Sequence, residues 1–189
     1  MTHRPAGRAG LVAALALMLA HPAVSTAQVL SNTATVTLNA VLAQSISVNI
    51  VAGSTVSFSL SNGTTASGNV PVVIQTSWNL TSTLVGAVSL YGYFSTPSQA
   101  LSDGAGDNIA SSSVEGRMTT GTPATFTAFS QTNPVGPASG SLALFTEAVT
   151  LLNSIKTRTD NLDLRINLTG QTIPAGSYTG TLTLQARAI

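Results

Sequence analysis

Apolar and polar residues alternate along the early part of the chain. Between residues 34 and 50 apolar side chains take every even position except 44, while hydroxyl and amide side chains take most of the odd ones. The apolar set is Ala34, Val36, Leu38, Ala40, Leu42, Ile46, Val48 and Ile50. Successive side chains of an extended chain point to opposite faces, so this pattern predicts β-strand with its even positions inward. Gln44 interrupts the apolar row, which predicts a bend or bulge near residues 43–45.

The same period of two recurs later in the chain. It predicts strands over residues 56–60, 69–80, 88–94, 160–168 and 177–188, weaker strands at 114–118 and 125–129, and another that opens at Leu142. Residues 97–113 and 130–140 are rich in turn-forming residues, and residues 145–155 fit a short helix about as well as a loop. The chain is therefore expected to be all-β, an antiparallel β-sandwich of about eight to ten strands.

The inward row of this sandwich should form its core. Trp78 shares its parity with Ile74, so its ring is expected to fill the space between two sheets. Leu164 and Leu184 take the same inward position on the two clearest late strands. We expect these four side chains to be structural.

The first 27 residues have the three parts of a secretory signal peptide. Arg4 and Arg8 precede an apolar block at residues 11–20, and the small residues Ser25, Thr26 and Ala27 follow. This predicts cleavage after Ala27, leaving residues 28–189 as one secreted domain, in the periplasm or at the cell surface, with no membrane insertion of the mature chain.

The composition of the mature chain excludes several kinds of catalytic and metal site. Both histidines, His3 and His21, lie in the predicted signal peptide, and the chain has no cysteine. Serine–histidine triads, cysteine nucleophiles, zinc sites and disulfides are thereby excluded from the mature chain. Its five Lys and Arg against six Asp and Glu include no basic cluster, which argues against nucleic acid as a partner. We expect no enzyme activity, catalytic residue, metal or cofactor.

Two smaller patterns leave alternatives open. Asp103, Asp107 and Asn108 could gather oxygens around calcium, but they do not match a known loop spacing, and an Asx-rich turn is the favoured interpretation. Tyr91 and Tyr93 point together to the face opposite Leu90, where two phenol rings could stack on a sugar. The favoured alternative is that a neighbouring strand or loop covers that face.

The end of the chain carries a resemblance to a known group of proteins. The run Ile173–Leu184, IPAGSYTGTLTL, resembles the final strand of bacterial pilin-like and spore-coat-U-like secreted domains, which end with a proline–alanine–glycine turn, a tyrosine and an alternating strand. The early alternating strand and the signal peptide are similar to those of fimbrial subunits. The disulfide that many fimbrial subunits carry is absent here. The resemblance implies an immunoglobulin-like sandwich and extracellular assembly, without inherited catalytic residues.

The edges of the predicted sheets also favour assembly. Only 7% of the residues are charged, so few Lys or inward charges protect an exposed edge from pairing with another strand. One hypothesis is that residues 29–42 are donated to a neighbouring copy, with Val29, Ala34, Val36, Leu38, Ala40 and Leu42 as the inserted row. The alternative, favoured because the pattern reveals no gap in the fold, is that this segment is the first strand of its own sandwich.

From the sequence we therefore expect a secreted structural subunit of a bacterial surface fibre, coat or matrix that assembles by strand pairing. Its expected partners are further copies of itself or related surface subunits, and a periplasmic chaperone. The alternative function is an extracellular carbohydrate-binding module that uses Tyr91 and Tyr93.

Overall fold

The structure, a computed structural model, describes residues 33–81 and 86–189. The predicted signal peptide and Val29 lie outside the described residues. The chain divides into two units, Met1–Ala40 and Val41–Ile189. We call the second unit the body. The predicted domain began at residue 28, whereas the body begins at Val41.

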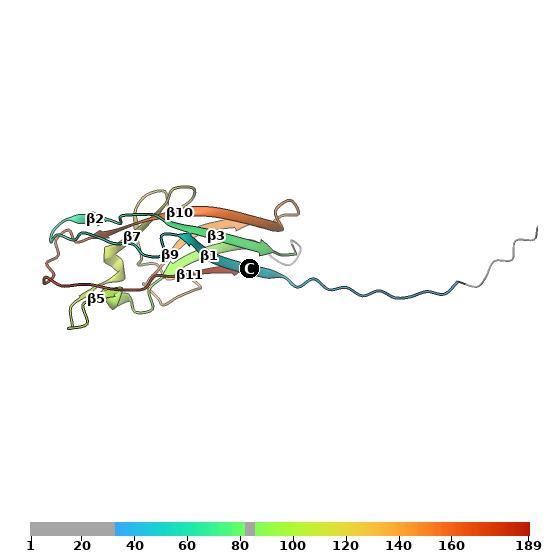
Figure 1. Ribbon diagram of the computed structural model, residues 1–189, viewed down its shortest axis with the longest axis horizontal. Coiled ribbons are helices and arrows are strands. Elements are labelled where there is room, and N and C mark those ends of the chain that lie inside the picture. The colour runs from blue at the N-terminus through green and yellow to red at the C-terminus, as the bar shows by residue number, and fades with distance from the viewer. Residues whose placement is uncertain (1–32, 82–85) are drawn as a thin grey trace, which may run out of the picture. The chain divides into compact units, whose positions relative to one another are not determined.

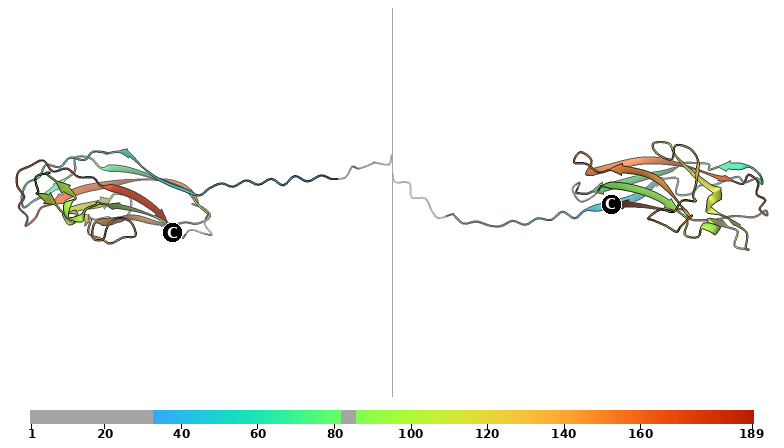
Figure 2. Two further views of the ribbon diagram at one scale, coloured as in Figure 1. Left: turned by 90° about the horizontal axis from the view of Figure 1, so that it is seen from below. Right: turned by 180° about the vertical axis from the view of Figure 1, so that it is seen from behind.

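The body is built from two antiparallel sheets (Figures 1 and 2). The strands of the first sheet lie in the order β1 (Ser45–Ala52), β3 (Val72–Asn79), β10 (Ile155–Asn167), β7 (Val114–Met118) and β8 (Thr127–Ala128), and β2 (Thr65–Ser67) also pairs with β10. The second sheet has the order β11 (Thr183–Ala188), β4 (Ala87–Tyr93) and β9 (Ser141–Ala148). This confirms the prediction of an all-β, sandwich-like fold.

Short elements complete the body. The hairpin β5 (Leu101–Ser102) and β6 (Asn108–Ile109) lies between two single 3-10 turns, Pro97–Gln99 and Ser111–Ser113. No helix among residues 33–81 and 86–189 has the length and apolar character needed to cross a membrane.

The core lies between the two sheets and follows the period-two pattern. Along β3 buried residues alternate with half-buried ones, so Val72, Ile74 and Trp78 point inward while Gln75 and Ser77 point outward. Leu162, Leu164 and Ile166 form the inward row of β10. Ile74, Trp78 and Leu164 are buried, and Leu184 is half-buried against the same cluster. This shared row of apolar side chains excludes water from between the sheets.

Several expected strands are shorter than their alternation suggested. Residues 33–44 form no strand, and their side chains are exposed, so the prediction of a strand segment on each side of residues 43–45 is wrong for the earlier segment. The irregularity in β1 lies between Ile50 and Ala52 instead of near residues 43–45. Residues 56–60 and 177–182 also lie outside the ladders. Alternating apolar and polar side chains indicate an extended backbone. A strand of a sheet also needs a neighbouring strand to which its backbone can hydrogen-bond.

The ambiguous stretch at residues 145–155 is neither helix nor simple loop. It contains the end of β9, a turn and the first residue of β10. The β9–β10 connection is therefore a hairpin-like turn that joins an edge strand of one sheet to a central strand of the other.

Candidate functional site

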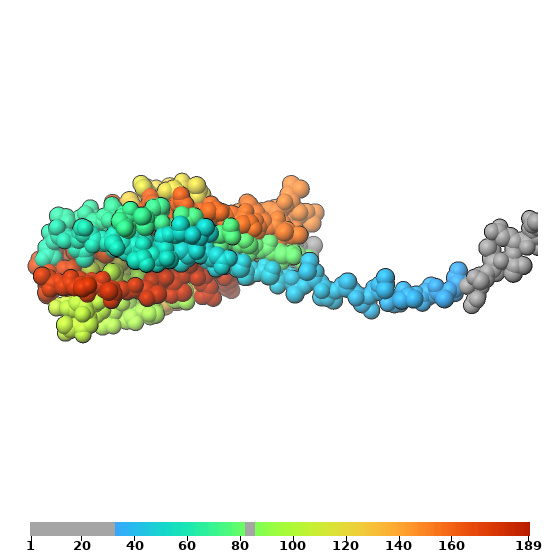
Figure 3. Space-filling view, viewed as in Figure 1, coloured from blue at the N-terminus to red at the C-terminus, as the bar shows by residue number. Residues whose placement is uncertain are grey.

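An apolar groove opens on one side of the sandwich. β1 and β11 are edge strands of their sheets, and they lie against each other, as the adjacent cyan and red bands in Figure 3 show. Further from Ser45 the two sheet edges part around a groove of about 730 Å³. Its lining side chains are mostly apolar and include Ile50, Val56, Phe58, Leu60, Val72, Phe94, Leu101, Val114, Leu164, Ile166, Tyr178, Leu182 and Leu184. On this side the groove is therefore lined by apolar side chains that also belong to the core.

Two extended segments form the rims of the groove. On one rim Val56, Phe58 and Leu60 are half-buried and alternate with exposed serines, as in a strand with one face inward. On the other rim Tyr178 and Leu182 are half-buried ahead of β11. Within the described residues, the backbone–backbone hydrogen bonds of residues 53–60 and 176–182 are those of Ser57 with Asn69 and of Thr179 with Ser102. Most backbone donors and acceptors of both rims are thus left for another strand or for water.

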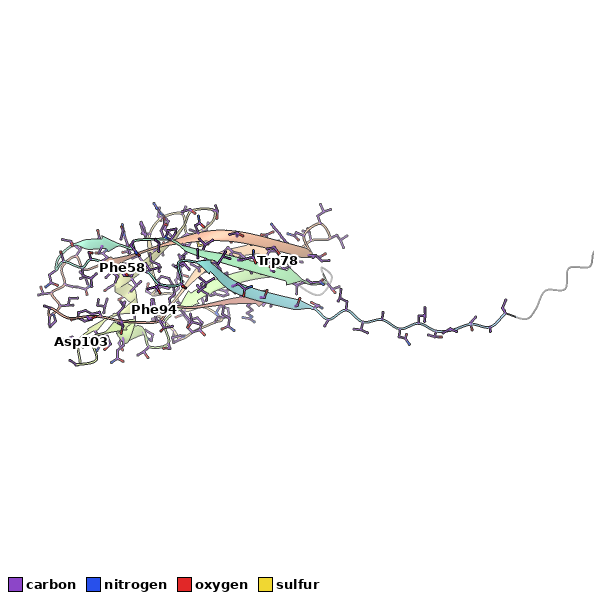
Figure 4. All side chains as sticks on the ribbon, in the orientation of Figure 1. Phe58, Trp78, Phe94 and Asp103 are labelled. Carbon is purple, nitrogen blue, oxygen red and sulfur yellow. The ribbon has the colours of Figure 1, made fainter. Side chains whose placement is uncertain are left out.

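The floor of the groove belongs to the core of the body. Phe58 and Phe94, both labelled in Figure 4, line the groove, and Phe94 packs edge-on against the buried Phe129, with ring centroids 5.3 Å apart. No Asp, Glu, Lys or Arg lines the groove in the described part of the chain. Burial, together with the charges of Asp107 and Asp103, raises the pKa of Tyr178, so its hydroxyl stays neutral and donates to the Pro174 carbonyl oxygen at 3.0 Å. Such a groove selects an uncharged apolar ligand.

The segment before β1 carries apolar side chains that have no burial in this structure. Val36, Leu38 and Leu42 are 82%, 89% and 80% exposed. They share one parity with Ala34 and Ala40, while Thr35, Thr37 and Asn39 take the opposite one. We call residues 33–44 the arm. An extended arm would present one apolar row from Ala34 to Leu42 and one mainly polar row that ends with Val41 and Ala43.

The opposite side of the sandwich is held together by charged side chains that the sequence analysis did not identify. Asp160 takes an inward position of β10 and is 2% exposed. The Arg158 guanidinium donates to both of its oxygens at 2.7 and 2.6 Å and to Glu147 of β9 at 2.9 Å. Hydrogen bonds to Asp160, opposed by burial, raise the pKa of Arg158, so the cation is permanent. This network ties the two sheets together across their edge.

Glu147 connects the network to the β9–β10 turn. Burial disfavours its ionisation, but hydrogen bonds from Lys156, Asn153 and Arg158 outweigh that effect and lower the pKa of Glu147. The Arg158 guanidinium also stacks 3.9 Å from the centre of the Phe145 ring. Lys156, the sole lysine, is thereby an ion-pair partner of Glu147.

Tyr91 and Tyr93 do not form an exposed sugar-stacking platform, and the covered face, which was the favoured alternative, is the one that the structure has. Tyr91 is 7% exposed, following a register irregularity between Leu90 and Tyr91 in the pairing of β4 with β9. Tyr93 is half-buried, and the backbone of Gly136 lies so close that a Cβ there would come within 2.5 Å of its ring. Loop residues thus pack on this face, and Tyr91 is closed to a ligand.

The Asp103 loop forms an Asx turn. Asp103 Oδ1 accepts hydrogen bonds from the N–H groups of Ala105, Gly106 and Asp107 at 2.8, 3.1 and 3.0 Å. These bonds, with that from Ala105 the strongest, lower the pKa of Asp103. Asn108 turns its amide to the Gly106 carbonyl oxygen. Over the residues that the structure describes, no three His, Cys, Asp or Glu side chains are grouped to hold a metal ion.

Comparison with known proteins adds no relative to this description. No protein-family model, no curated protein and no solved structure matches the chain.

One feature of the sequence favours an extended arm before β1. From Thr33 to Ala52 there is no Gly or Pro, and Gly53 is the first residue after β1 with a positive φ, 70°. A segment without turn residues favours one continuous extended run over a strand that folds back on β1. The charged network gave no comparable signal, because its members meet only when β9 of one sheet packs next to β10 of the other.

Proposed function

We propose that this protein is a secreted structural subunit of a surface fibre, coat or matrix, and that copies assemble when the arm of one enters the groove of the next. The observation that carries the proposal is the match between an uncharged apolar groove with unpaired rims and an uncharged arm with a single apolar row. The inserted arm would bury Val36 and Leu38 and hydrogen-bond to both rims, as in strand addition to a sheet edge.

Donation to a second copy is favoured over folding back into the same body. A return into the chain's own groove would need a tight turn next to Ser45. Ala43 and Gln44 stand there, and neither residue readily adopts the positive φ of a two-residue hairpin turn. A body completed by an arm would correspond to an immunoglobulin-like sandwich, which agrees with the resemblance of Ile173–Leu184 to pilin-like and spore-coat-U-like domains. Before assembly, a periplasmic chaperone would be a suitable partner for the open groove.

A parity test addresses the proposal directly. In the exported protein, V36D together with L38D places charges on the apolar row of the arm, whereas the matched control T35D with T37D places the same charges on the polar row. We expect the first variant to remain monomeric and the control to assemble like the wild type, measured by sedimentation velocity. Assembly by the V36D/L38D variant at the wild-type level would contradict the proposal.

A peptide with the sequence of residues 33–44 provides the complementary measurement. It should bind the V36D/L38D protein, whose groove is unoccupied, and should block assembly of the wild type. The same peptide with Asp at positions 36 and 38 is the control. Equal binding of both peptides would show that the apolar row of the arm is not what the groove recognises.

A further inference from the structure

Exposed large apolar side chains gather at one end of the body. Leu151, Leu152 and Ile155 are 83%, 98% and 71% exposed, and Ile189 is 53% exposed. The ladders place Ser45, Asn79 and Ile155 next to one another, and the N–H of Gly86 donates to the Ile189 carbonyl oxygen while the N–H of Val149 donates to Gly86. These residues therefore share the end at which the chain enters β1, which we call the entry end (Figure 1).

The turn that carries the two leucines, residues 149–154, is held in place by several hydrogen bonds. Asn153 Oδ1 accepts from the Thr150 N–H at 2.6 Å, and Asn153 Nδ2 donates to Glu147 at 3.0 Å and to the Ala148 carbonyl oxygen at 2.9 Å. The Trp78 indole N–H donates to the Asn153 carbonyl oxygen at 2.8 Å, and the N–H of Leu80 donates to Ser154. Adjacent leucines on a fixed turn form a preorganised apolar contact.

We infer that Leu151 and Leu152 pack against the neighbouring copy that receives the arm, as a second contact between subunits. This inference rests on the proposed function. Only Ala43 and Gln44 separate the apolar row of the arm from Ser45. Three residue spacings cover at most about 11 Å of extended chain, so a copy whose groove holds Leu42 must stand against the entry end. The 149–154 turn extends beyond Ile155 at that end and meets the receiving copy.

Photocrosslinking tests the contact without disturbing native thiols, because the chain has no cysteine. L152C is labelled with a benzophenone maleimide, and V51C, which lies in β1 and replaces a 61% exposed side chain, is the control. Illumination of assembled protein should join L152C to a second copy, at peptides that border its groove, and V51C should give far less of this product. Products confined to one chain would overturn the inference.

A substitution pair measures what the contact contributes. L151S with L152S should weaken assembly about tenfold or more, because shielding half of each leucine from water is worth that much. V51S with V70S removes two exposed valines elsewhere and should leave assembly unchanged. The inference would be overturned if both double variants weakened assembly equally, or if L151S/L152S did not weaken it.

Two outcomes distinguish failure of the leucine contact from failure of the proposed arm donation. If V36D/L38D assembles normally, the arm is not the link and the proposed function fails. If the arm is required but L152C gives no crosslink between copies, only the second contact fails. Loss of binding to phosphatidylcholine–phosphatidylglycerol vesicles in L151S/L152S, with self-association intact, would assign the turn to a lipid surface and overturn the inference.

Discussion

One side of this sandwich is closed by charged side chains, and the other side is open along a groove. Where β9 meets β10, Asp160, Arg158 and Glu147 form a continuous set of charge-assisted hydrogen bonds across the gap between the sheets. Where β1 and β11 separate, apolar side chains reach the surface and the rim backbones lack ladder partners. One side is complete within a single chain, and the other has the chemistry of an interface.

If the proposed function holds, the difference explains how one fold could combine stability with assembly. Charged groups that satisfy one another leave nothing for a partner to bind, whereas unpaired backbone groups beside apolar surface favour the addition of a strand. A subunit needs the first condition to remain folded alone and the second to join a neighbour. The predictions below act on one side at a time.

The largest expected effect is on the charged side. D160A removes two of the three hydrogen bonds that the Arg158 guanidinium makes to carboxylates and leaves Glu147 as its remaining partner, so we expect a loss of about 2–3 kcal/mol in the free energy of unfolding, measured by urea denaturation. The matched control is D163N, whose partner Arg117 is 41% exposed and whose loss should stay below about 1 kcal/mol. Similar losses in both variants would show that burial does not distinguish the two ion pairs.

An intermediate effect is expected on the groove side. F58A removes a half-buried ring from the rim and should lower the affinity for the residue 33–44 peptide at least about tenfold, or about 1.4 kcal/mol, measured by fluorescence anisotropy. The control F126A removes another half-buried ring, which lies over the Arg117 and Arg165 guanidinium groups and outside the groove. Equal loss of affinity in F126A would place the peptide elsewhere.

The smallest effect is a pH dependence confined to the charged side. The pKa of Glu147 is lower in the folded chain than its ordinary value of 4.5, so its contribution to stability is complete above that value and is lost as the pH falls through the lower, folded one. E147Q should flatten this part of the curve of unfolding free energy against pH, by less than about 1 kcal/mol. If E147Q lost stability at acid pH as steeply as the wild type, the loss could not come from protonation of Glu147.

Binding of the residue 33–44 peptide should depend little on salt concentration. The groove is lined by no Asp, Glu, Lys or Arg, and residues 33–44 contain no ionisable side chain. We therefore expect the affinity to change by less than about twofold between 0.05 and 0.5 M salt, since there are no charges for salt to screen. A strong salt dependence would indicate that the peptide binds near the charged side.

The sequence pattern predicted strands and their inward faces correctly where a segment's own pattern decides its conformation. The strand expected at residues 114–118 is β7 with the same bounds, and the inward parity of Ile74 and Leu164 holds in β3 and β10. It failed at the arm and at residues 56–60, where a strand-like pattern has no ladder partner. At Tyr91 two interpretations were open, and an irregularity in the pairing with β9, together with packing around the strand, decides for the covered face.

Period-two alternation is a property of the local backbone, because each residue's side chain is directed by the pleat it sits in. For that reason an all-β chain with a defined inward row could be inferred from the order of the amino acids. Tertiary packing brings together residues from separate strands, such as Glu147 with Arg158, and places the two rims at residues 53–60 and 176–182 along the same groove. Which edges closed and which stayed open was settled only when the sheets packed, since that geometry determines which backbone groups find a partner.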